Sequence, residues 1–146
     1  MKVLVLLSGG VDSSTCLALA KEKYGDNVLA LSMSYGQKHA KELAAAQAIA
    51  DYYHVELLHM DLSKIFAHSK CSLLQGSDES VPHASYAEQL KESKGEPVST
   101  YVPFRNGLFL SAAASIALEY ECNEIYYGPH ADDAVSYTHL TQPTIR

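Results

Sequence analysis

A short run of glycines and hydroxyl-bearing residues, at positions 8–14, separates an apolar stretch from a stretch of helix formers. Glycine permits positive φ and leaves no Cβ in the way of a ligand, which applies to both Gly9 and Gly10. The backbone N–H groups of such a loop can form a concave anion site, and a helix that begins there adds its positive dipole end. The run is therefore predicted to bind phosphate, and the alternative is a tight turn with Asp12 or Ser13 as helix N-cap. The residues assigned to the phosphate site are Ser8, Gly9, Gly10, Val11, Asp12, Ser13 and Ser14.

Two common phosphate-loop patterns are absent from the sequence. Neither GxxxxGKS/T, the loop of many kinases and ATPases, nor GxGxxG, the loop of dinucleotide-binding folds, occurs in it. The loop at positions 8–14 is therefore predicted to be of another type, without a lysine.

The apolar pattern around this loop predicts strands that alternate with helices. Short apolar runs are typical of buried strands, and one-sided apolar periodicity is typical of helices. This order predicts an α/β fold with an open parallel sheet, right-handed crossovers and helices on both faces. Ligands of such sheets bind at the carboxyl ends of the strands, where the glycine loop stands. The expected strands are residues 2–7, 28–35, 55–60 and 124–127, and the expected helices are residues 12–24, 38–53 and 106–120.

Composition limits the classes of function. The chain has 146 residues, 47% of them hydrophobic, which is enough for one domain with a buried core. A formal net charge of −6 and no Lys/Arg-rich block disfavour nucleic-acid binding and favour a small ligand. No stretch is long enough to predict a membrane span or a signal peptide. The scattered cysteines Cys16, Cys71 and Cys122 suit a cytoplasmic location and show no zinc-ligand spacing.

Four motifs in one order and spacing resemble a known family. The SGGVDS run at 8–13 resembles the pyrophosphate loop of the ATP-pyrophosphatase (PP-loop) superfamily, which has an adenine nucleotide alpha hydrolase-like fold. The other motifs are YGQKH at 35–39 with EL at 42–43, TYVPFRN at 100–106, and GPHADDA at 128–134. Together the four resemble the 7-cyano-7-deazaguanine synthase family of queuosine biosynthesis over residues 1–134.

The resemblance implies an ATP-dependent ligase. Its family converts 7-carboxy-7-deazaguanine and ammonia to the nitrile 7-cyano-7-deazaguanine (preQ0) by carboxylate adenylation, amide formation and dehydration. Adenylation is needed because carboxylate oxygens are poor leaving groups, and a loop without lysine suits a diphosphate that leaves as one unit. The implied cofactors are ATP and Mg²⁺, together with a zinc ion bound in the family by clustered cysteines that this sequence lacks.

The positions of these motifs predict individual roles. Asp12 is expected to orient the loop or to carry Mg²⁺. Tyr35 and Gly36 are expected near adenine or ribose, and the alternative for Tyr35 is a place at the edge of the core. Arg105 is expected to neutralise a phosphate or the substrate carboxylate, and the alternative is a solvated surface arginine. Asn106 is expected at the substrate, or simply as a helix cap.

An acidic turn follows the expected fourth strand. Asp132 or Asp133, beside His130, is expected to accept hydrogen bonds from N1–H and the 2-amino group of the deazaguanine, while the other carboxylate could bind Mg²⁺. The alternative is a solvated acidic turn. The residues expected to be catalytic are Asp12, Arg105, Asp132 and Asp133, and the histidines expected at the surface or in loops are His54, His59, His68 and His83.

The last part of the sequence departs from the family pattern. Residues 135–146 carry no cysteine and no family motif, whereas family members continue with the zinc-binding segment. We expect residues 1–134 to form an incomplete PP-loop synthase domain, and residues 135–146 to be a tail of the kind that translated adaptor sequence produces. Residues 61–100 lack strong periodicity, which is typical of a functional lid or a disordered insert.

Three other functions stay open at this stage. The chain could be another adenylating enzyme that acts on a different carboxylate or on tRNA, a nucleotide-binding module without chemistry, or a structural fragment. The expected partners are 7-carboxy-7-deazaguanine, ATP and ammonia, with no nucleic acid and no membrane, and a homodimer is one possible assembly.

Overall fold

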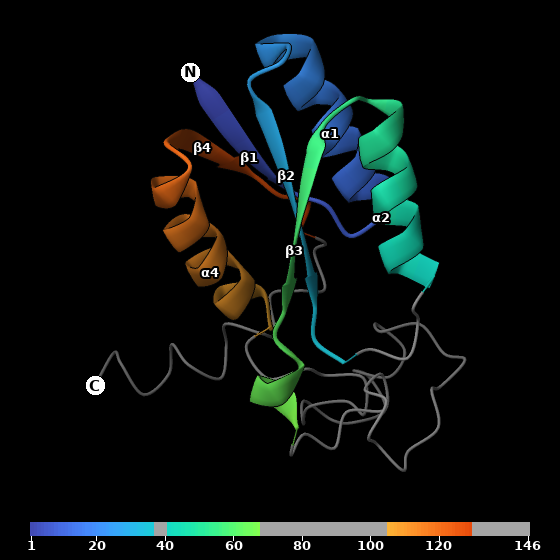
Figure 1. The fold of residues 1–146 in the computed structure, drawn as a ribbon, viewed down its shortest axis with the longest axis vertical. Coiled ribbons are helices and arrows are strands. Elements are labelled where there is room, and N and C mark those ends of the chain that lie inside the picture. Colours follow the sequence, from blue (N-terminus) through green and yellow to red (C-terminus); the bar gives the residue numbers. More distant parts are fainter. Residues whose placement is uncertain (37–40, 68–104, 130–146) are drawn as a thin grey trace, which may run out of the picture.

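A parallel β-sheet flanked by helices forms the part of the chain that the computed structural model describes, residues 1–36, 41–67 and 105–129. Its four strands lie in the order β3-β2-β1-β4 (Figure 1). The strands are β1 (Lys2–Leu6), β2 (Val28–Ser34), β3 (Glu56–Asp61) and β4 (Cys122–Tyr126). The helices are α1 (Val11–Tyr24), α2 (Lys41–Tyr52), α4 (Arg105–Glu119) and a short 3-10 helix, η1 (Ser63–Phe66).

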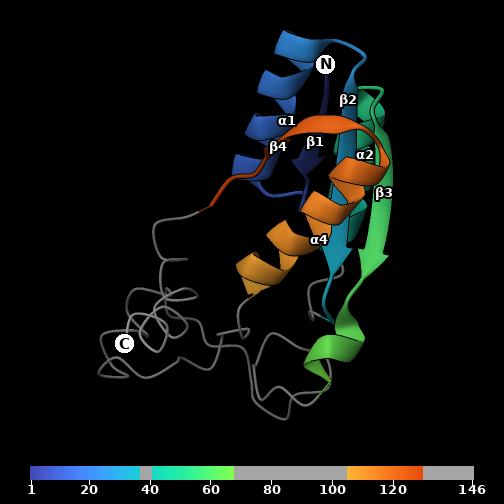
Figure 2. The same cartoon turned by 90° about the vertical axis from the view of Figure 1, so that its left-hand side faces the viewer.

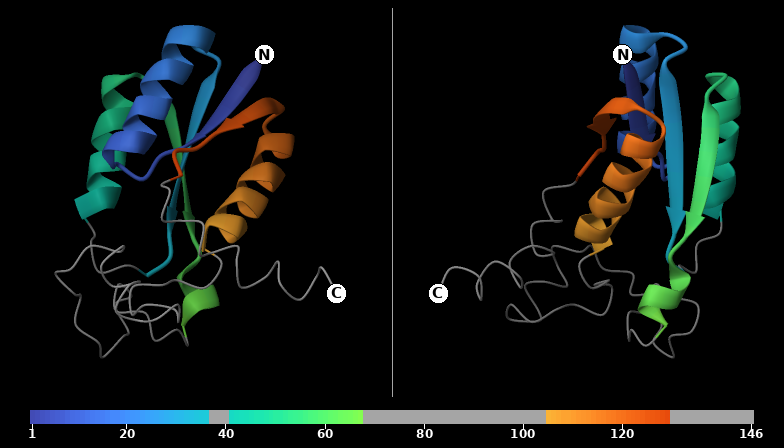
Figure 3. Two further views of the ribbon diagram at one scale, coloured as in Figure 1. Left: turned by 180° about the vertical axis from the view of Figure 1, so that it is seen from behind. Right: turned by 60° about the vertical axis from the view of Figure 1, so that its left-hand side comes forward.

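The helices cover both faces of the sheet, as predicted. Helices α1 and α2 pack on one face of the sheet (Figures 2 and 3). Leu17 of α1 and Ala46 of α2 belong to one buried apolar cluster with Val5 of β1. Helix α4 packs on the other face, where Ala113 meets Leu4. Because β1 is covered on both faces, its residues form a continuous apolar run without alternation.

The strand order creates a point where the chain changes direction across the sheet. The chain passes from β1 outward to β2 and β3, and then returns to place β4 on the opposite side of β1. All three strand pairs are parallel, with Leu6 opposite Leu31 and Val5 opposite Tyr126. Open α/β sheets bind ligands at such a point, outside the carboxyl ends of the strands.

The predicted elements are confirmed, with shifted ends. Helix α1 begins at Val11, one residue before the predicted start, and β4 begins at Cys122 instead of residue 124. Helix α2 begins at Lys41, and residues 37–40 lie outside the described residues. The helix η1 was not predicted, because four residues are too few to show a periodic pattern. The rest of the weakly patterned segment, from residue 68 to residue 100, also lies outside the described residues.

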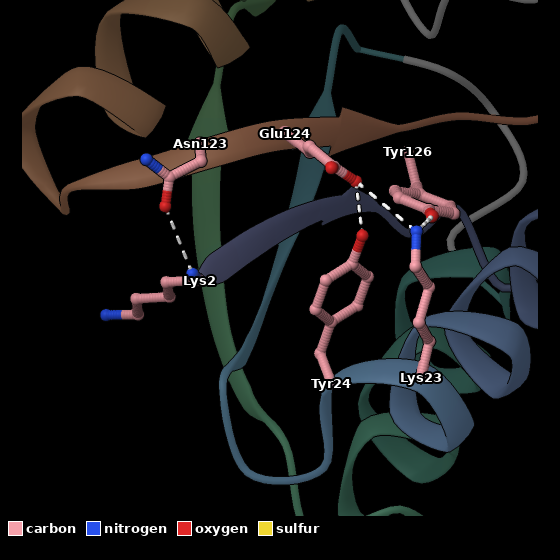
Figure 4. A network of polar contacts seen from close by, with 6 residues as sticks. All are labelled: Lys2, Lys23, Tyr24, Asn123, Glu124 and Tyr126. Carbon is pink, nitrogen blue, oxygen red and sulfur yellow. Dashed lines mark hydrogen bonds and ion pairs between the residues drawn. The ribbon is translucent and has the colours of Figure 1, made fainter.

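A polar network ties the edge strand β4 to the last turn of α1 (Figure 4). The Tyr24 hydroxyl donates a hydrogen bond to the Glu124 carboxylate. Lys23 donates to the Tyr126 hydroxyl over 3.4 Å, and its Nζ lies 4.0 Å from the same carboxylate. The rings of Tyr24 and Tyr126 meet edge to face, with centroids 6.2 Å apart. This α1–β4 network runs from the last turn of α1 along β4 as far as its last residue, Tyr126, which is paired with Val5 of β1.

One further contact fixes the start of β4. The Lys2 N–H donates to Oδ1 of Asn123 over 3.3 Å (Figure 4). The pairing of β1 with β4 shifts register between Lys2 and Val3, so this side-chain contact lies where the ladder is irregular. None of the helices in the described ranges is long and apolar enough to cross a membrane.

Candidate functional site

A cavity of about 340 Å³ lies at the carboxyl ends of β1, β2 and β4. Its volume falls within the range of about 300–1,000 Å³ that is usual for small-molecule pockets. Apolar residues at the strand ends, among them Leu31 and Met33, form much of its lining. The structure brings five of the predicted site residues together around it: Ser8, Ser13, Tyr35, Arg105 and Asn106.

The two glycines of the loop have different conformations. Gly9 has φ +90°, and a Cβ there would lie 2.5 Å from the Glu42 carbonyl oxygen and 2.8 Å from the Ala46 nitrogen. The loop therefore lies directly against α2, and only glycine fits. Gly10 has φ −80° and ψ 170°, so of the two glycines only Gly9 uses the positive φ that glycine permits. A Cβ at Gly10 would have a single near neighbour, Ser8 Oγ at 3.6 Å, so this side of the loop is open.

Serine hydroxyls hold the loop in shape. The Ser8 N–H donates to Ser13 Oγ over 3.2 Å, and the two hydroxyl oxygens lie 3.0 Å apart. Ser13 and Ser14 both donate to the Gly10 carbonyl, over 3.1 and 2.6 Å. Ser13 is buried. Since these hydroxyls already have partners within the loop, their contact with phosphate stays a prediction.

Helix α1 begins without a side-chain cap. Its N-cap is Gly10, so the alternative prediction of Asp12 or Ser13 as N-cap is wrong. The Ser14 N–H makes the first helical bond, to the Gly10 carbonyl over 3.0 Å. The N–H groups of the first helical turn have no acceptor within an α-helix, and the positive end of the dipole is located there. An anion at this end would meet both.

The end of β4 approaches the start of α1. A Cβ at Gly128 would lie 3.0 Å from the Cβ of Asp12, so a side chain at Gly128 would crowd the first turn of the helix. The acidic turn predicted to read the substrate continues from this point. Its residues His130, Asp132 and Asp133 lie outside the described residues.

Tyr35 joins the cavity to a small aromatic cluster. Its ring lies 6.2 Å from that of Phe66 in η1 and 5.7 Å from that of Phe109 in α4. The Arg105 guanidinium lies 5.6 Å from the Tyr35 ring centroid, and its Nη1 donates to the Tyr35 hydroxyl over 3.3 Å. Tyr35 is buried and also lines the cavity, so the core position is confirmed while the contact with adenine or ribose stays a prediction. Arg105 is half-buried, which contradicts the alternative of a solvated surface arginine.

Two neighbouring residues complete this side of the site. Asn106 is the second residue of α4, so the alternative prediction of a helix cap is wrong. Its Oδ1 accepts a hydrogen bond from Nε of Arg105 over 3.3 Å. Gly36 follows Tyr35 with φ +81°, a conformation that favours glycine, and thereby turns the chain away from β2.

Metal ligands are sparse in the described part of the chain. It contains no group of three His, Cys, Asp or Glu side chains that could hold a metal ion. Burial raises the pKa of the thiols of Cys16 and Cys122, so neither favours the thiolate that binds zinc. Zinc therefore does not fit these residues. Mg²⁺ fits better at the exposed carboxylate of Asp12, because this ion is commonly held by one or two carboxylates together with substrate phosphates.

A serine, a histidine and an aspartate also meet at the carboxyl ends of β2 and β3. Ser34 Oγ lies 3.4 Å from His59 Nε2 and donates to Asp61 Oδ1 over 3.3 Å. The serine thus lies between the other two groups, whereas a nucleophilic triad needs the histidine in the middle. Asp61 accepts the Ser63 N–H over 2.9 Å, and this bond lowers the pKa of its carboxyl. The group is a surface network, and the exposure of His59, like that of His54, confirms the prediction for both histidines.

Sequence reasoning missed Ser32 and gave no role to Glu42, although both line the cavity. Ser32 stands among buried apolar residues of β2, and a single serine in such a run gives no periodic or motif signal. Glu42 is in a quoted motif, and its carbonyl oxygen is the group against which Gly9 packs.

The fold and the loop together define the class of protein. A lysine-free SGGVDS loop between the first strand and first helix of a parallel sheet belongs to the adenine nucleotide alpha hydrolase-like (PP-loop) fold. The solved structure of NH3-dependent NAD synthetase from Campylobacter jejuni, in complex with the nitrate ion, matches this fold with a TM-score of 0.56 and 18% sequence identity. The match covers 84% of this chain and 45% of that one.

Within this class, the chain belongs to the family described as queuosine biosynthesis protein QueC, whose model matches residues 2–146. Similar curated proteins carry the name 7-cyano-7-deazaguanine synthase. The protein from Thermoplasma volcanium is 40% identical over 138 residues, which are 93% of this chain and 53% of that protein. The protein from Legionella pneumophila is 41% identical over 138 residues, which are 94% and 55% of the two chains. The chain thus spans about half the length of the curated relatives it matches.

Proposed function

We propose that this chain binds ATP at the glycine loop and contributes the ATP-binding half of a 7-cyano-7-deazaguanine synthase. The observation that carries the proposal is the loop itself. Gly9 is packed against α2, Gly10 is open, and α1 begins beside them without a side-chain cap. This arrangement suits a diphosphate group bound by backbone N–H groups, in a family whose relatives bear that enzyme name.

The proposed reaction proceeds through two activations in one pocket. A carboxylate oxygen of 7-carboxy-7-deazaguanine attacks the α-phosphorus of ATP, and diphosphate leaves. Ammonia then displaces AMP from the acyl adenylate and gives the amide. Activation of the amide oxygen by a second ATP, followed by loss of AMP and a proton, gives the nitrile. A loop without lysine favours AMP and diphosphate as the products of ATP, and not ADP and phosphate.

The residues around the cavity have distinct proposed roles. The first turn of α1 holds the β,γ-diphosphate, and Asp12 holds Mg²⁺, which would neutralise charge on the phosphates. Arg105 neutralises a phosphate or the substrate carboxylate, with its guanidinium already oriented by Tyr35 and Asn106. Because these contacts already restrict the Arg105 side chain, it loses less conformational entropy when an anion binds than a solvated arginine would.

The acidic turn after β4 is proposed to read the substrate base. Because Gly128 lies against Asp12, this turn starts beside the phosphate loop. Asp132 or Asp133, next to His130, accepts the N1–H and the 2-amino group of the deazaguanine. A homodimer, a cytoplasmic location and a domain boundary at Ala134 also stay predictions from the sequence.

Product analysis tests the proposal. The chain, and a version extended with the carboxyl-terminal half of a full-length relative, are each incubated with ATP, Mg²⁺, ammonium and 7-carboxy-7-deazaguanine. Mass spectrometry should detect the nitrile in the extended version, with AMP as nucleotide product. ATP binding without nitrile in the extended version would instead favour a nucleotide-binding module without chemistry. If calorimetry detects no ATP binding to either version, the proposal fails.

A further inference from the structure

Ser32 has a buried hydroxyl group without a hydrogen-bond partner. Its side chain lies in β2, and the residue is only 2% exposed. Among the described residues, its Oγ is the one buried side-chain oxygen or nitrogen for which no partner exists. Buried polar atoms in proteins nearly always have a partner, and one that lacks a partner calls for an explanation. Ser32 also lines the cavity at the carboxyl ends of the strands.

The surroundings of Ser32 hold it in place. Its strand β2 lies between β1 and β3, and Ser32 is paired with His59 of β3. The Leu7 N–H donates to the carbonyl of the preceding residue, Leu31, over 2.9 Å. Since the backbone is fixed on both sides, the hydroxyl is a preorganised donor and acceptor at the cavity wall. Ser32 is the one polar residue in the buried part of β2, Val28 to Met33.

The position of Ser32 relative to the other parts of the site indicates which part of a ligand it meets. The phosphate loop follows β1, and the acidic turn proposed for the substrate follows β4. Strand β2 lies on the opposite side of β1 from β4. A nucleotide with its phosphates over β1 can therefore place its other end over β2. Leu31 and Met33, whose side chains project from the other face of β2, also line the cavity and are buried and apolar. The part of the cavity at the end of β2 therefore suits a flat ring better than a phosphate.

We propose that the Ser32 hydroxyl forms a hydrogen bond with the purine base of the bound nucleotide and is a specificity-determining residue of the site. The inference rests on the proposed function, because it takes ATP as the ligand. In the nucleotide complex the hydroxyl gains the partner that it lacks in the free chain. The same hydroxyl could form a hydrogen bond with the ring of 7-carboxy-7-deazaguanine instead. The experiment therefore measures the affinity for ATP and the affinity for 7-carboxy-7-deazaguanine separately.

The test compares Ser32→Ala with Ser34→Ala, a matched control on the same strand whose hydroxyl already has His59 and Asp61 as partners. Calorimetry measures binding of ATP, inorganic pyrophosphate and 7-carboxy-7-deazaguanine, and calorimetric melting measures stability. Ser32→Ala should bind ATP about 3- to 10-fold more weakly, the effect of one lost neutral hydrogen bond, and pyrophosphate with unchanged affinity. Its melting temperature without ligand should be equal or higher, since an unsatisfied buried group is removed. Ser34→Ala should bind ATP like the unsubstituted chain.

A ligand-binding role and a structural role of Ser32 predict different results for Ser32→Ala. A ligand-binding role predicts weaker ATP binding together with an equal or higher melting temperature. A Ser32→Ala chain that melts lower and binds all ligands more weakly would show a structural role and overturn the inference. Unchanged ATP affinity would overturn it too, as would an equal loss of pyrophosphate affinity or a loss confined to the deazaguanine. Each of these results leaves the proposed function standing, provided that the unsubstituted chain binds ATP. Failure of the unsubstituted chain to bind ATP would overturn both.

Discussion

Two regions of the sheet differ in how their polar groups are partnered. In the α1–β4 network, Lys23, Tyr24, Glu124 and Tyr126 are partners of one another (Figure 4). At the cavity, the hydroxyls of Ser8 and Ser13 are partners of each other, but α1 begins without a side-chain cap, and the Ser32 hydroxyl has no partner within the described residues.

This difference separates groups that stabilise the fold from groups kept for a ligand. An internal partner within the α1–β4 network contributes to stability in the free chain. At the cavity, the groups that lack an internal partner are costly to the free chain and gain their partners when a ligand binds. Substitutions in the α1–β4 network should therefore change stability and leave binding intact, and substitutions on the open side of the loop should do the reverse. The glycine loop contains one residue of each kind.

The largest effect is expected for Gly9→Ala. Its Cβ would lie 2.5 Å from the Glu42 carbonyl oxygen, and the backbone would keep a φ of +90°. Strain and overpacking together should lower the free energy of unfolding by about 2–5 kcal/mol, measured by urea denaturation. The matched control is Gly10→Ala, where φ is −80° and the Cβ has room, so stability should change by less than about 1 kcal/mol. Equal losses in the two variants would contradict this distinction.

The next effect, on binding, is expected for Gly10→Val. The valine side chain would occupy the open side of the loop and keep phosphate from the backbone N–H groups. Loss of two hydrogen bonds to a charged phosphate, each worth about 1.5 kcal/mol, corresponds to about 100-fold weaker ATP binding. Calorimetry measures the affinity, and urea denaturation should show that the variant remains folded. A folded Gly10→Val chain with normal ATP affinity would contradict the phosphate role of the loop.

Much of this arrangement could be predicted from the sequence, because it depends on local signals. Apolar runs, helix formers and glycines follow one another within a few residues, and they predicted the parallel sheet and the loop between β1 and α1. The opposite φ signs of Gly9 and Gly10 were not predictable, because the contact of the loop with α2 decides them. The contact of the Arg105 guanidinium with Tyr35 joins residues 70 positions apart, and no local pattern encodes it.

The unsatisfied hydroxyl of Ser32 shows the same limit. A serine in an apolar strand is compatible with a surface position, a partnered position or a ligand contact, and the sequence does not distinguish these. Only the positions of β1 and β3 on either side show that the residue is buried and without a partner. The sequence thus predicted where the site lies. The packed structure was needed to distinguish the residues that support the fold from those that are available to a ligand.

A smaller effect is expected for Tyr24→Phe in the α1–β4 network. This variant removes the hydroxyl that donates to Glu124 and keeps the ring that packs against Tyr126. The melting temperature should fall by a few degrees, while the affinity for ATP should stay the same, because Tyr24 does not line the cavity. A control is Thr15→Ser, which keeps the hydroxyl that donates to the Val11 carbonyl on an exposed part of α1. A Tyr24→Phe chain that binds ATP more weakly would show that the α1–β4 network is coupled to the ligand site.

The smallest effect is a change in the pH dependence of stability. The hydrogen bond to the Glu124 carboxylate raises the pKa of Tyr24, because only the protonated phenol can donate it. The folded chain thus holds this proton more tightly than the unfolded chain, in which the pKa is about 10. The contribution is fully present below the unfolded pKa and is lost as pH rises through the higher, folded pKa. Urea midpoints measured from about pH 8 upward should therefore fall more steeply for the unsubstituted chain than for Tyr24→Phe. The other tyrosines are present in both chains, so their contributions to the pH dependence cancel when the two curves are subtracted. Parallel curves would mean that the bond between Tyr24 and Glu124 adds nothing to stability, and the contrast between the α1–β4 network and the cavity would then depend on packing alone.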